Sequence, residues 1–175
     1  MTTCPTCDII TSKQGLLYED AKIAAFLSPA PLSVGHILVA PKQHVPILEQ
    51  VPDYIINELW VKANKLSIAL FESIGAEGTN IVIANGPAAG QVLPHAMLNV
   101  VARKQNDGLQ LQWQPKKLGD EEMAKMEELL KGACGAIGEF QSEPQKPIEI
   151  KAPVELPEKT ESGESYLLKQ LRRLP

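Results

Sequence analysis

The central part of this sequence is TNIVIANGPAAGQVLPHAMLNVVAR, residues 79–103. A strand-forming run is followed by a Gly/Pro/Ala turn at 85–90 and by a second predicted strand that contains His95, Met97 and Asn99. Residues two apart in a strand point to the same face, so we expect these three side chains to share one face. A glycine-bounded loop beside them can bind a phosphate through its backbone N–H groups. The stretch therefore predicts two strands and a loop suited to an anion.

The motif Gly90-Gln91-x-x-x-His95-x-Met97-x-Asn99 in this stretch resembles the signature of the histidine triad (HIT) family of nucleotide hydrolases and transferases, G-Q-x-x-x-H-x-H-x-H. Further matches in the family's order and at about its spacing cover roughly residues 4 to 115: Cys4-Pro5-Thr6-Cys7, Tyr18-Glu19-Asp20, Ala25-Phe26-Leu27, Gly35-His36-Ile37-Leu38-Val39-Ala40-Pro41-Lys42-x-His44 and Asn85-Gly86. The resemblance implies an α+β fold, an antiparallel half-barrel of about five strands with a long helix across it. It also implies a homodimer.

Several departures from the family signature affect the residues that carry its chemistry. In the family the middle histidine attacks the α-phosphorus and carries the nucleotidyl group, and its position is Met97 here. A thioether cannot form and release such an intermediate, and Asn99 at the third position has no useful pKa for proton transfer. Val92 stands where the family usually has Ser or Thr, and Ser28 stands where it has an Asp for the ribose hydroxyls. The triad positions His95, Met97 and Asn99 are therefore predicted to be non-catalytic.

The resemblance still implies a weakened site for a purine nucleotide. Its candidate residues are Ser28, His36, Asn85, Gly90, Gln91 and Asn99. His36 fits either the nucleotide pocket or a buried imidazole bonded to backbone. We expect a protein that binds a nucleotide weakly or acts as a scaffold. One alternative is a HIT-type hydrolase of nucleotide phosphoramidates or dinucleotide polyphosphates that uses His36 or His95. Another is an interaction module that works through its C-terminal tail.

Cys4 and Cys7 form a C-x-x-C motif ahead of any predicted helix, a poor setting for a thioredoxin-type redox pair and a better one for a metal. In zinc-containing HIT relatives the ligands resemble four residues of this chain: Cys4, Cys7, His44 and His95. Together they would complete a Cys₂His₂ tetrahedron, so the resemblance implies zinc as a cofactor. The alternative is that the cysteines are terminal thiols and His95 is an ordinary strand histidine.

The remaining periodicity predicts the other elements. Strands are expected at 21–28 and 36–40. A helix is expected over 52–74, with an apolar stripe that packs on the sheet: Ile56, Leu59, Trp60, Ala63, Leu66, Leu70 and Ile74. Leu109, Leu111 and Trp113 alternate with glutamines, which predicts a further strand.

A second helix is predicted from Asp120, its N-cap, to about Phe140. It carries apolar residues on one side: Met123, Met126, Leu130 and Ile137. Methionines at helical spacing are usually packing residues, and Cys134 is expected to be a small core residue.

Composition predicts one domain at 1–141, a Pro/Glu/Lys-rich linker at 142–165 and a short basic and apolar segment at 166–175. The leucines of the last segment have helical spacing, so we expect it to dock on the protein's own dimer or on a protein partner. A frayed terminus is the alternative. A net charge of −4 gives no electrostatic reason to expect nucleic-acid binding. No apolar run predicts a signal peptide or membrane span, so a cytoplasmic protein is expected.

Overall fold

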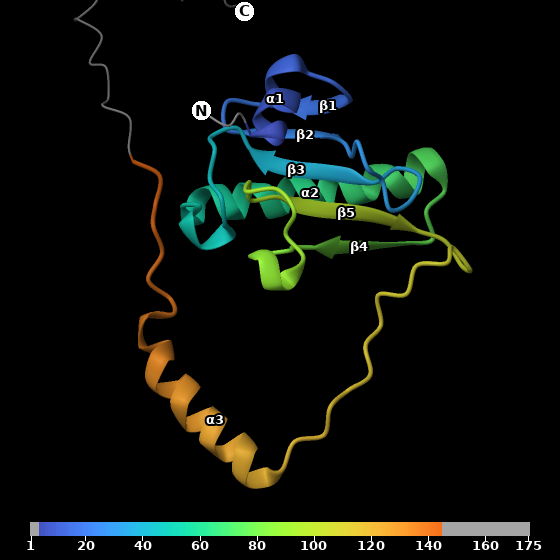
Figure 1. The fold of residues 1–175 in the computed structure, drawn as a ribbon. Coiled ribbons are helices and arrows are strands. Elements are labelled where there is room, and N and C mark those ends of the chain that lie inside the picture. The colour runs from blue at the N-terminus through green and yellow to red at the C-terminus, as the bar shows by residue number, and fades with distance from the viewer. Residues whose placement is uncertain (1–3, 145–175) are drawn as a thin grey trace, which may run out of the picture. The chain divides into compact units, whose positions relative to one another are not determined.

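The computed structural model describes residues 4–144 and shows an α+β fold built on one open sheet (Figure 1). Its strands are β1 (Leu16–Glu19), β2 (Ile23–Leu27), β3 (Ile37–Pro41), β4 (Gly78–Val82) and β5 (Leu98–Arg103). They have the order β1-β2-β3-β5-β4, and every neighbouring pair is antiparallel. The α-helices are α1 (Pro5–Ser12), α2 (Asp53–Ile74) and α3 (Asp120–Ala133). The predicted fold class is confirmed.

The long helix α2 lies where the apolar stripe predicts it. It begins after Pro52, and Gly75 ends it in the left-handed conformation with φ of 61°. Its inward face contacts alternate residues of the strands, and the resulting core contains Leu59, Ala63 and Leu70 from the helix with Ile23, Val39, Leu98 and Val100 from the sheet. Trp60 was expected in this core, but it is 42% exposed. It is displaced by about 100° around the helix from Leu59 and so points outward.

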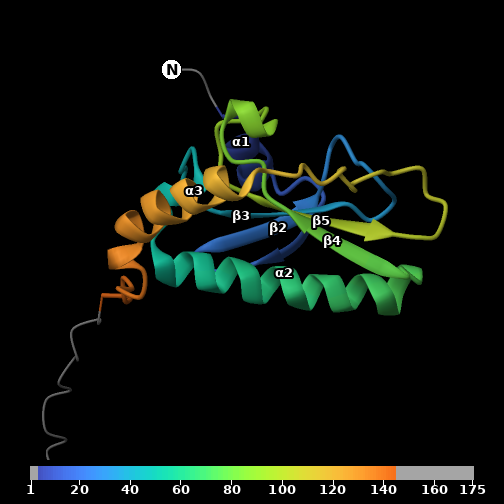
Figure 2. The same ribbon diagram turned by 90° about the horizontal axis from the view of Figure 1, so that it is seen from below.

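A smaller apolar cluster covers the other face of the sheet. The strands β2 and β3 contribute Phe26 and Leu38 to it, and α1 contributes Ile10. Because successive residues of a strand face opposite sides, four of the five β2 residues and all five of β3 are buried. Figure 2 shows the sheet between α2 on one face and α1 on the other.

The motif strand is shorter than the sequence predicts. β5 begins at Leu98, so His95 and Met97 precede it. The backbone explains the difference, because the Ala96 N–H donates to the carbonyl of Val45, outside the strand ladder, at 2.7 Å. The two-residue alternation nevertheless continues through the irregular segment. Ala96 and Leu98 lie in the core beneath α2, whereas Met97 packs in the opposite cluster.

The segment after β5 differs most from expectation. Residues 109–119 form no helix or strand, and Trp113 is 85% exposed. The Arg103 side chain binds both the Asp107 carboxylate and the Leu109 carbonyl, which holds the chain in a turn. An alternating pattern needs a neighbouring strand to become a sheet strand, and no described strand pairs with these residues.

The helix α3 is also shorter and less covered than predicted. Gly119, not Asp120, is its N-cap, and it ends at Ala133 before a short 3₁₀ turn. The glycines at its far end explain the early stop. Cys134 and the four apolar side chains that were predicted to pack are all exposed: Met123, Met126, Leu130 and Ile137. The prediction that these residues lie in the core is therefore wrong for the single chain. The predicted docking segment, 166–175, lies outside the described residues. Within residues 4–144, no helix has the length and apolar character needed to span a bilayer.

Candidate functional site

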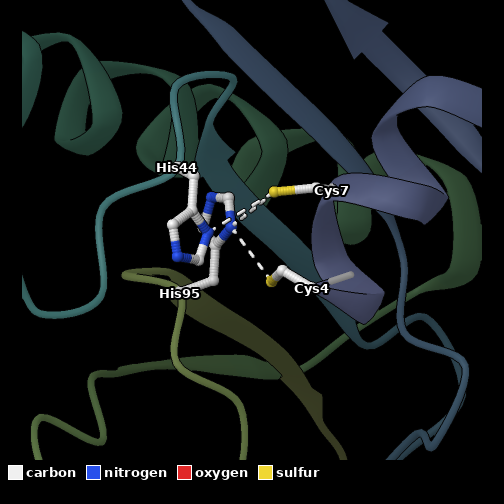
Figure 3. Close-up of side chains that lie close together, drawn as sticks. All are labelled: Cys4, Cys7, His44 and His95. Atoms are coloured by element: carbon white, nitrogen blue, oxygen red, sulfur yellow. Dashed lines mark hydrogen bonds between the residues drawn. The ribbon is translucent and has the colours of Figure 1, made fainter. Parts of the chain in front are cut away.

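Four side chains from distant parts of the sequence meet between α1 and the sheet (Figure 3). Cys4, Cys7, His44 and His95 each offer one ligand atom, and these atoms all lie within 4.8 Å of one another. The Cys7 sulfur is 3.5 Å from Nδ1 of His44 and 3.6 Å from Nδ1 of His95, and the Cys4 sulfur is 3.7 Å from the same His95 nitrogen. The group could hold a metal ion. Two thiolates and two imidazoles form the closed donor set typical of structural zinc.

The two cysteines are positioned by the first turn of α1. Cys4 is its N-cap residue in an extended conformation, and Pro5 occupies the first helical position, where a missing N–H costs nothing. Residues three apart on a helix lie on the same side, so Cys4 and Cys7 both face the histidines. The prediction that the C-x-x-C lies ahead of any helix is therefore wrong. Cysteine is not among the residues that usually mark an N-cap, which removes the main sequence signal for this start.

The orientation of His95 fits a metal ligand. Its Nε2 lies 2.9 Å from the carbonyl oxygen of Pro41, an acceptor, so Nε2 carries the proton and Nδ1 presents its lone pair to the sulfurs. A backbone carbonyl that fixes the far nitrogen of a histidine is a recurrent feature of metal sites. Burial lowers the pKa of His95, although the Pro41 carbonyl opposes this. The neutral form that a metal requires is thereby favoured.

Without a metal, the surroundings of Cys7 favour its protonated thiol, which is not the form that binds a metal. Burial, followed by the adjacent Cys4, raises the pKa of Cys7 above its ordinary value. A divalent cation would offset this, because ligation favours the thiolate. Metal binding at this site would therefore release a proton.

His36 and Asn99 form a second polar pair on the sheet. His36 is 4% exposed, and its Nδ1 accepts a hydrogen bond from the Leu32 N–H at 3.2 Å. Its Nε2 is therefore the protonated nitrogen and donates to Oδ1 of Asn99 at 3.2 Å, while Nδ2 of Asn99 donates to the Val82 carbonyl. The imidazole is held by backbone on one side and by a former triad position on the other.

Stability should fall in acid because of His36. Burial lowers its pKa below the ordinary 6.5, with the Asn99 hydrogen bond opposing the shift. The unfolded chain takes up a proton first as the pH falls, so the stability that neutral His36 provides above about pH 6.5 is lost as the pH falls toward the folded-state pKa. Urea unfolding at pH 7.5 and 5.5 should show this drop, and His36→Gln should have a flatter dependence. Equal slopes for the two proteins would contradict the assignment.

The loop at 85–91 is braced by its own side chains. Gln91 accepts from the Gly86 N–H and donates to the carbonyls of Pro46 and Leu93. Asn85 accepts from the Leu48 N–H and donates to Glu49. These contacts fix the loop against the segment after β3.

Several expected phosphate donors of this loop are already engaged. The N–H groups of Ala89, Gly90 and Gln91 donate to carbonyls within the loop itself. Ser28 lies beside His36, since its N–H donates to the His36 carbonyl, and its hydroxyl accepts from the Ala30 N–H. The predicted nucleotide residues thus form two separate hydrogen-bonded groups, one around His36 and one around the loop.

Met97 lies apart from both groups. Its half-buried side chain packs against the apolar cluster that contains Phe26, Leu38 and Ile10. The three triad positions thus have different surroundings: His95 faces the cysteines, Met97 faces an apolar cluster, and Asn99 bonds to His36.

Sequence reasoning does not identify two backbone groups of the site, the Pro41 carbonyl and the Leu32 N–H. They fix the tautomers of the two buried histidines. Every residue type offers a carbonyl and nearly every one an N–H, so neither leaves a signal in the sequence.

Comparison with known proteins gives the family. The HIT domain model matches residues 11–106. An uncharacterized HIT-like protein from Methanocaldococcus jannaschii is 33% identical over 136 residues, which cover 75% of this chain and 99% of that protein. The chain belongs to the HIT family. Cys4 and Cys7 precede the matched range, so the family match does not bear on half of the candidate metal ligands.

Two further HIT proteins are similar to this chain. Adenylylsulfatase HINT3 from Arabidopsis thaliana is 36% identical over 108 residues, which are 61% of this chain and 55% of the plant protein. The chain thus spans little more than half the length of that relative. A Zn-bound histidine triad family protein from Mycobacterium smegmatis matches with a TM-score of 0.59 and 29% identity, over 75% of this chain and 97% of that one.

Proposed function

We propose that this protein is a zinc-stabilised HIT homodimer that binds a purine nucleotide weakly, or serves as a scaffold, without hydrolysing nucleotides. The observation that carries the proposal is the divergence of the triad. Met97 offers no nucleophile, and its side chain is committed to an apolar cluster. Both nitrogens of His95 are engaged, one toward the cysteines and one by the Pro41 carbonyl. A metal-bound imidazole has no free lone pair with which to attack phosphorus.

Zinc is the metal that the donor set supports best. Two thiolates with two imidazoles suit a tetrahedral Zn²⁺, which when bound supplies structural cross-linking rather than chemistry. The orientation of His95 and the Zn-bound mycobacterial relative both support this choice. The three free cysteines fit a reducing compartment, so we also propose a cytoplasmic location.

The nucleotide would bind near His36, Asn99 and the loop at 85–91. Val92 is exposed beside this loop and offers no hydrogen bond, and the Ser28 hydroxyl replaces a carboxylate. Each lost contact costs on the order of 1 kcal/mol, so the two together weaken binding by tens of fold.

Calorimetry with AMP tests the nucleotide site. The double variant Ser28→Asp, Val92→Ser should bind AMP about thirtyfold more tightly than the natural protein, which corresponds to about 2 kcal/mol. Ser73→Asp with Leu129→Ser makes comparable changes at exposed positions of α2 and α3 and should leave the affinity unchanged. If neither the natural protein nor the first double variant binds AMP, the proposed nucleotide binding is wrong and the scaffold function remains.

A dimer would cover two surfaces that the single chain leaves open, the free edge of β4 and an apolar patch on α2. Among the described strands β4 pairs only with β5, so its other edge is unpaired, and such an edge invites a further strand. The outward side of α2 exposes a row of large apolar residues: Trp60, Val61, Ile68 and Phe71. We propose that a second copy covers both.

Sizing by light scattering at micromolar concentration should give a dimer. Trp60→Glu with Phe71→Glu places charges in the proposed interface and should shift the protein to a monomer. Leu32→Glu with Val34→Glu also charges exposed apolar residues, but in the loop before β3, and should leave the dimer intact. A natural protein that elutes as a clean monomer would rule out the proposed pairing.

A hydrolase is the second candidate. It is favoured by several relatives that are named as nucleotide hydrolases, among them the adenylylsulfatase that is 36% identical to this chain. His36 would have to replace the missing nucleophile, because the pKa of its buried imidazole is lowered and the neutral form can attack. Its Nδ1 and Nε2 are both hydrogen-bonded, to Leu32 and Asn99, which makes this the weaker candidate.

A further inference from the structure

The helix α1 is attached to the sheet by two separate contacts. At its N-terminal end, Cys4 and Cys7 meet His44 and His95. One turn further on, Ile10 is 7% exposed and packs in the cluster on the face opposite α2. An eight-residue helix is too short to persist by itself in water. Thr6 of the same helix is only 1% exposed, and Ile9 packs against the same cluster as Ile10. The position of α1 therefore depends on the cysteine group and on these packed side chains.

The two cysteine sulfurs can serve in two mutually exclusive ways. They can bind a metal together with the histidines, or they can bond to each other. The residues lie one helical turn apart, and their sulfurs are within 4.8 Å, so a disulfide at about 2.05 Å needs only a local movement of the first turn. Both cysteines are partly exposed, which gives a small reagent access to them.

We propose that this C-x-x-C pair is a redox switch that releases the metal and detaches α1 from the sheet. The inference rests on the proposed zinc site. The oxidant is a small disulfide such as glutathione disulfide. One cysteine thiolate attacks a sulfur of this reagent, forms a mixed disulfide and expels one glutathione thiolate. The second cysteine thiolate then attacks the mixed disulfide and expels the other. The Cys4–Cys7 bond forms, two electrons pass to the reagent, and Zn²⁺ leaves.

The histidines cannot hold the metal or the helix alone. After oxidation the site keeps only two of its four ligands, and α1 is then held only by its packed side chains: Thr6, Ile9 and Ile10. Detachment of α1 would uncover Phe26, Leu38 and Met97 on the sheet. Exposed apolar side chains of this kind form a surface for association. The oxidised protein would therefore differ from the reduced protein in shape as well as in metal content.

The test uses the full-length chain in a Cys134→Ser background, because Cys134 is exposed and could pair between molecules. The reduced, zinc-loaded protein is treated with glutathione disulfide in the presence of a chromogenic zinc chelator. We expect two thiols to be lost for each zinc released, and dithiothreitol with added zinc to restore both. Hydrogen exchange at the amides of residues 5–12 should become at least tenfold faster on oxidation. The amides of α2 provide an internal control and should not change.

Ile10→Ala isolates the second contact. In the reduced, zinc-loaded form it should change exchange in α1 little, since the metal still holds the helix. In the oxidised form it should accelerate that exchange beyond the tenfold change above. Equal exchange in the oxidised parent and variant would show that Ile10 does not hold α1 and would overturn the two-contact model.

The outcomes separate this inference from the proposed function. A reduced protein without zinc would overturn both. Zinc that stays bound, with both thiols intact under glutathione disulfide, would overturn only the switch. Zinc release with unchanged protection of α1 would overturn the detachment.

Discussion

Replacing Cys7 with serine should release the metal and lower the melting temperature by about 10 °C or more. A serine hydroxyl does not ionise to replace the thiolate, and structural zinc in small peptides contributes about 10–16 kcal/mol of binding free energy. Even a third of that would be about 4 kcal/mol, and each kcal/mol shifts the melting temperature of a chain this size by roughly 2–4 °C. Elemental analysis and differential scanning calorimetry measure the two effects.

Cys134→Ser is the matched control for this prediction. Cys134 is exposed and lies outside the candidate metal group, so its replacement should leave about one zinc per chain and an unchanged melting temperature. A strong chelator added to the natural protein should reproduce the Cys7→Ser loss. Natural protein that carries no metal, or a Cys7→Ser variant of unchanged stability, would contradict the zinc site.

Turnover of nucleotide substrates should be absent from the natural protein. Residues of a catalytic triad act as a unit, and losing the nucleophile of such a unit costs on the order of a millionfold in rate. The natural protein and Met97→Ala should therefore give the same background rate with adenosine phosphoramidate, diadenosine polyphosphate and adenylyl sulfate. The reason is that Met97 has no chemical role in the proposed site.

The double variant Met97→His, Asn99→His completes this experiment. It restores the residue types of the family signature and reports the rate that the remaining site can support. Hydrolysis by the natural protein above the rate of Met97→Ala would overturn the non-enzymatic proposal and favour the hydrolase.

The elements that the sequence predicts well are those with a strong local pattern. The helix α2 follows from a long 3.6-residue periodicity, and β2 and β3 follow from compact apolar runs. Trp60 shows the limit of this approach. It is next to Leu59 in the apolar stripe. Only the position of the sheet determines that Leu59 packs between α2 and the sheet whereas the Trp60 indole points to the outside.

The elements that the sequence predicts poorly depend on distant contacts. The helix α1 is short and has no usual N-cap, which leaves Pro5 at its first position as the main sequence signal for its start. The late start of β5 depends on a hydrogen bond from the Ala96 N–H to the carbonyl of Val45, which lies 51 residues earlier in the chain. Residues 109–114 have the alternation of a strand, but none of the described strands pairs with them.

The candidate site was likewise predictable only in part. The resemblance brings together Cys4, Cys7, His44 and His95, and the structure places them within reach of one metal ion. What the sequence could not supply is the state of each buried imidazole. The Pro41 carbonyl and the Leu32 N–H decide it, because they select which ring nitrogen carries the proton.

The candidate metal group spans the chain in a way that bears on folding. Cys4 and His95 are separated by 91 positions, so a metal that joins them would close a loop around most of the sheet. In the chain-entropy picture, a cross-link of that size restricts the unfolded ensemble by about 4–5 kcal/mol. The two cysteines precede every described strand in the chain, whereas His95 follows four of the five. Because β4 pairs only with β5 among the described strands, only β1, β2 and β3 could be paired when His95 appears. A metal captured at that point would hold the start of β5 beside β3 before β4 can join the sheet.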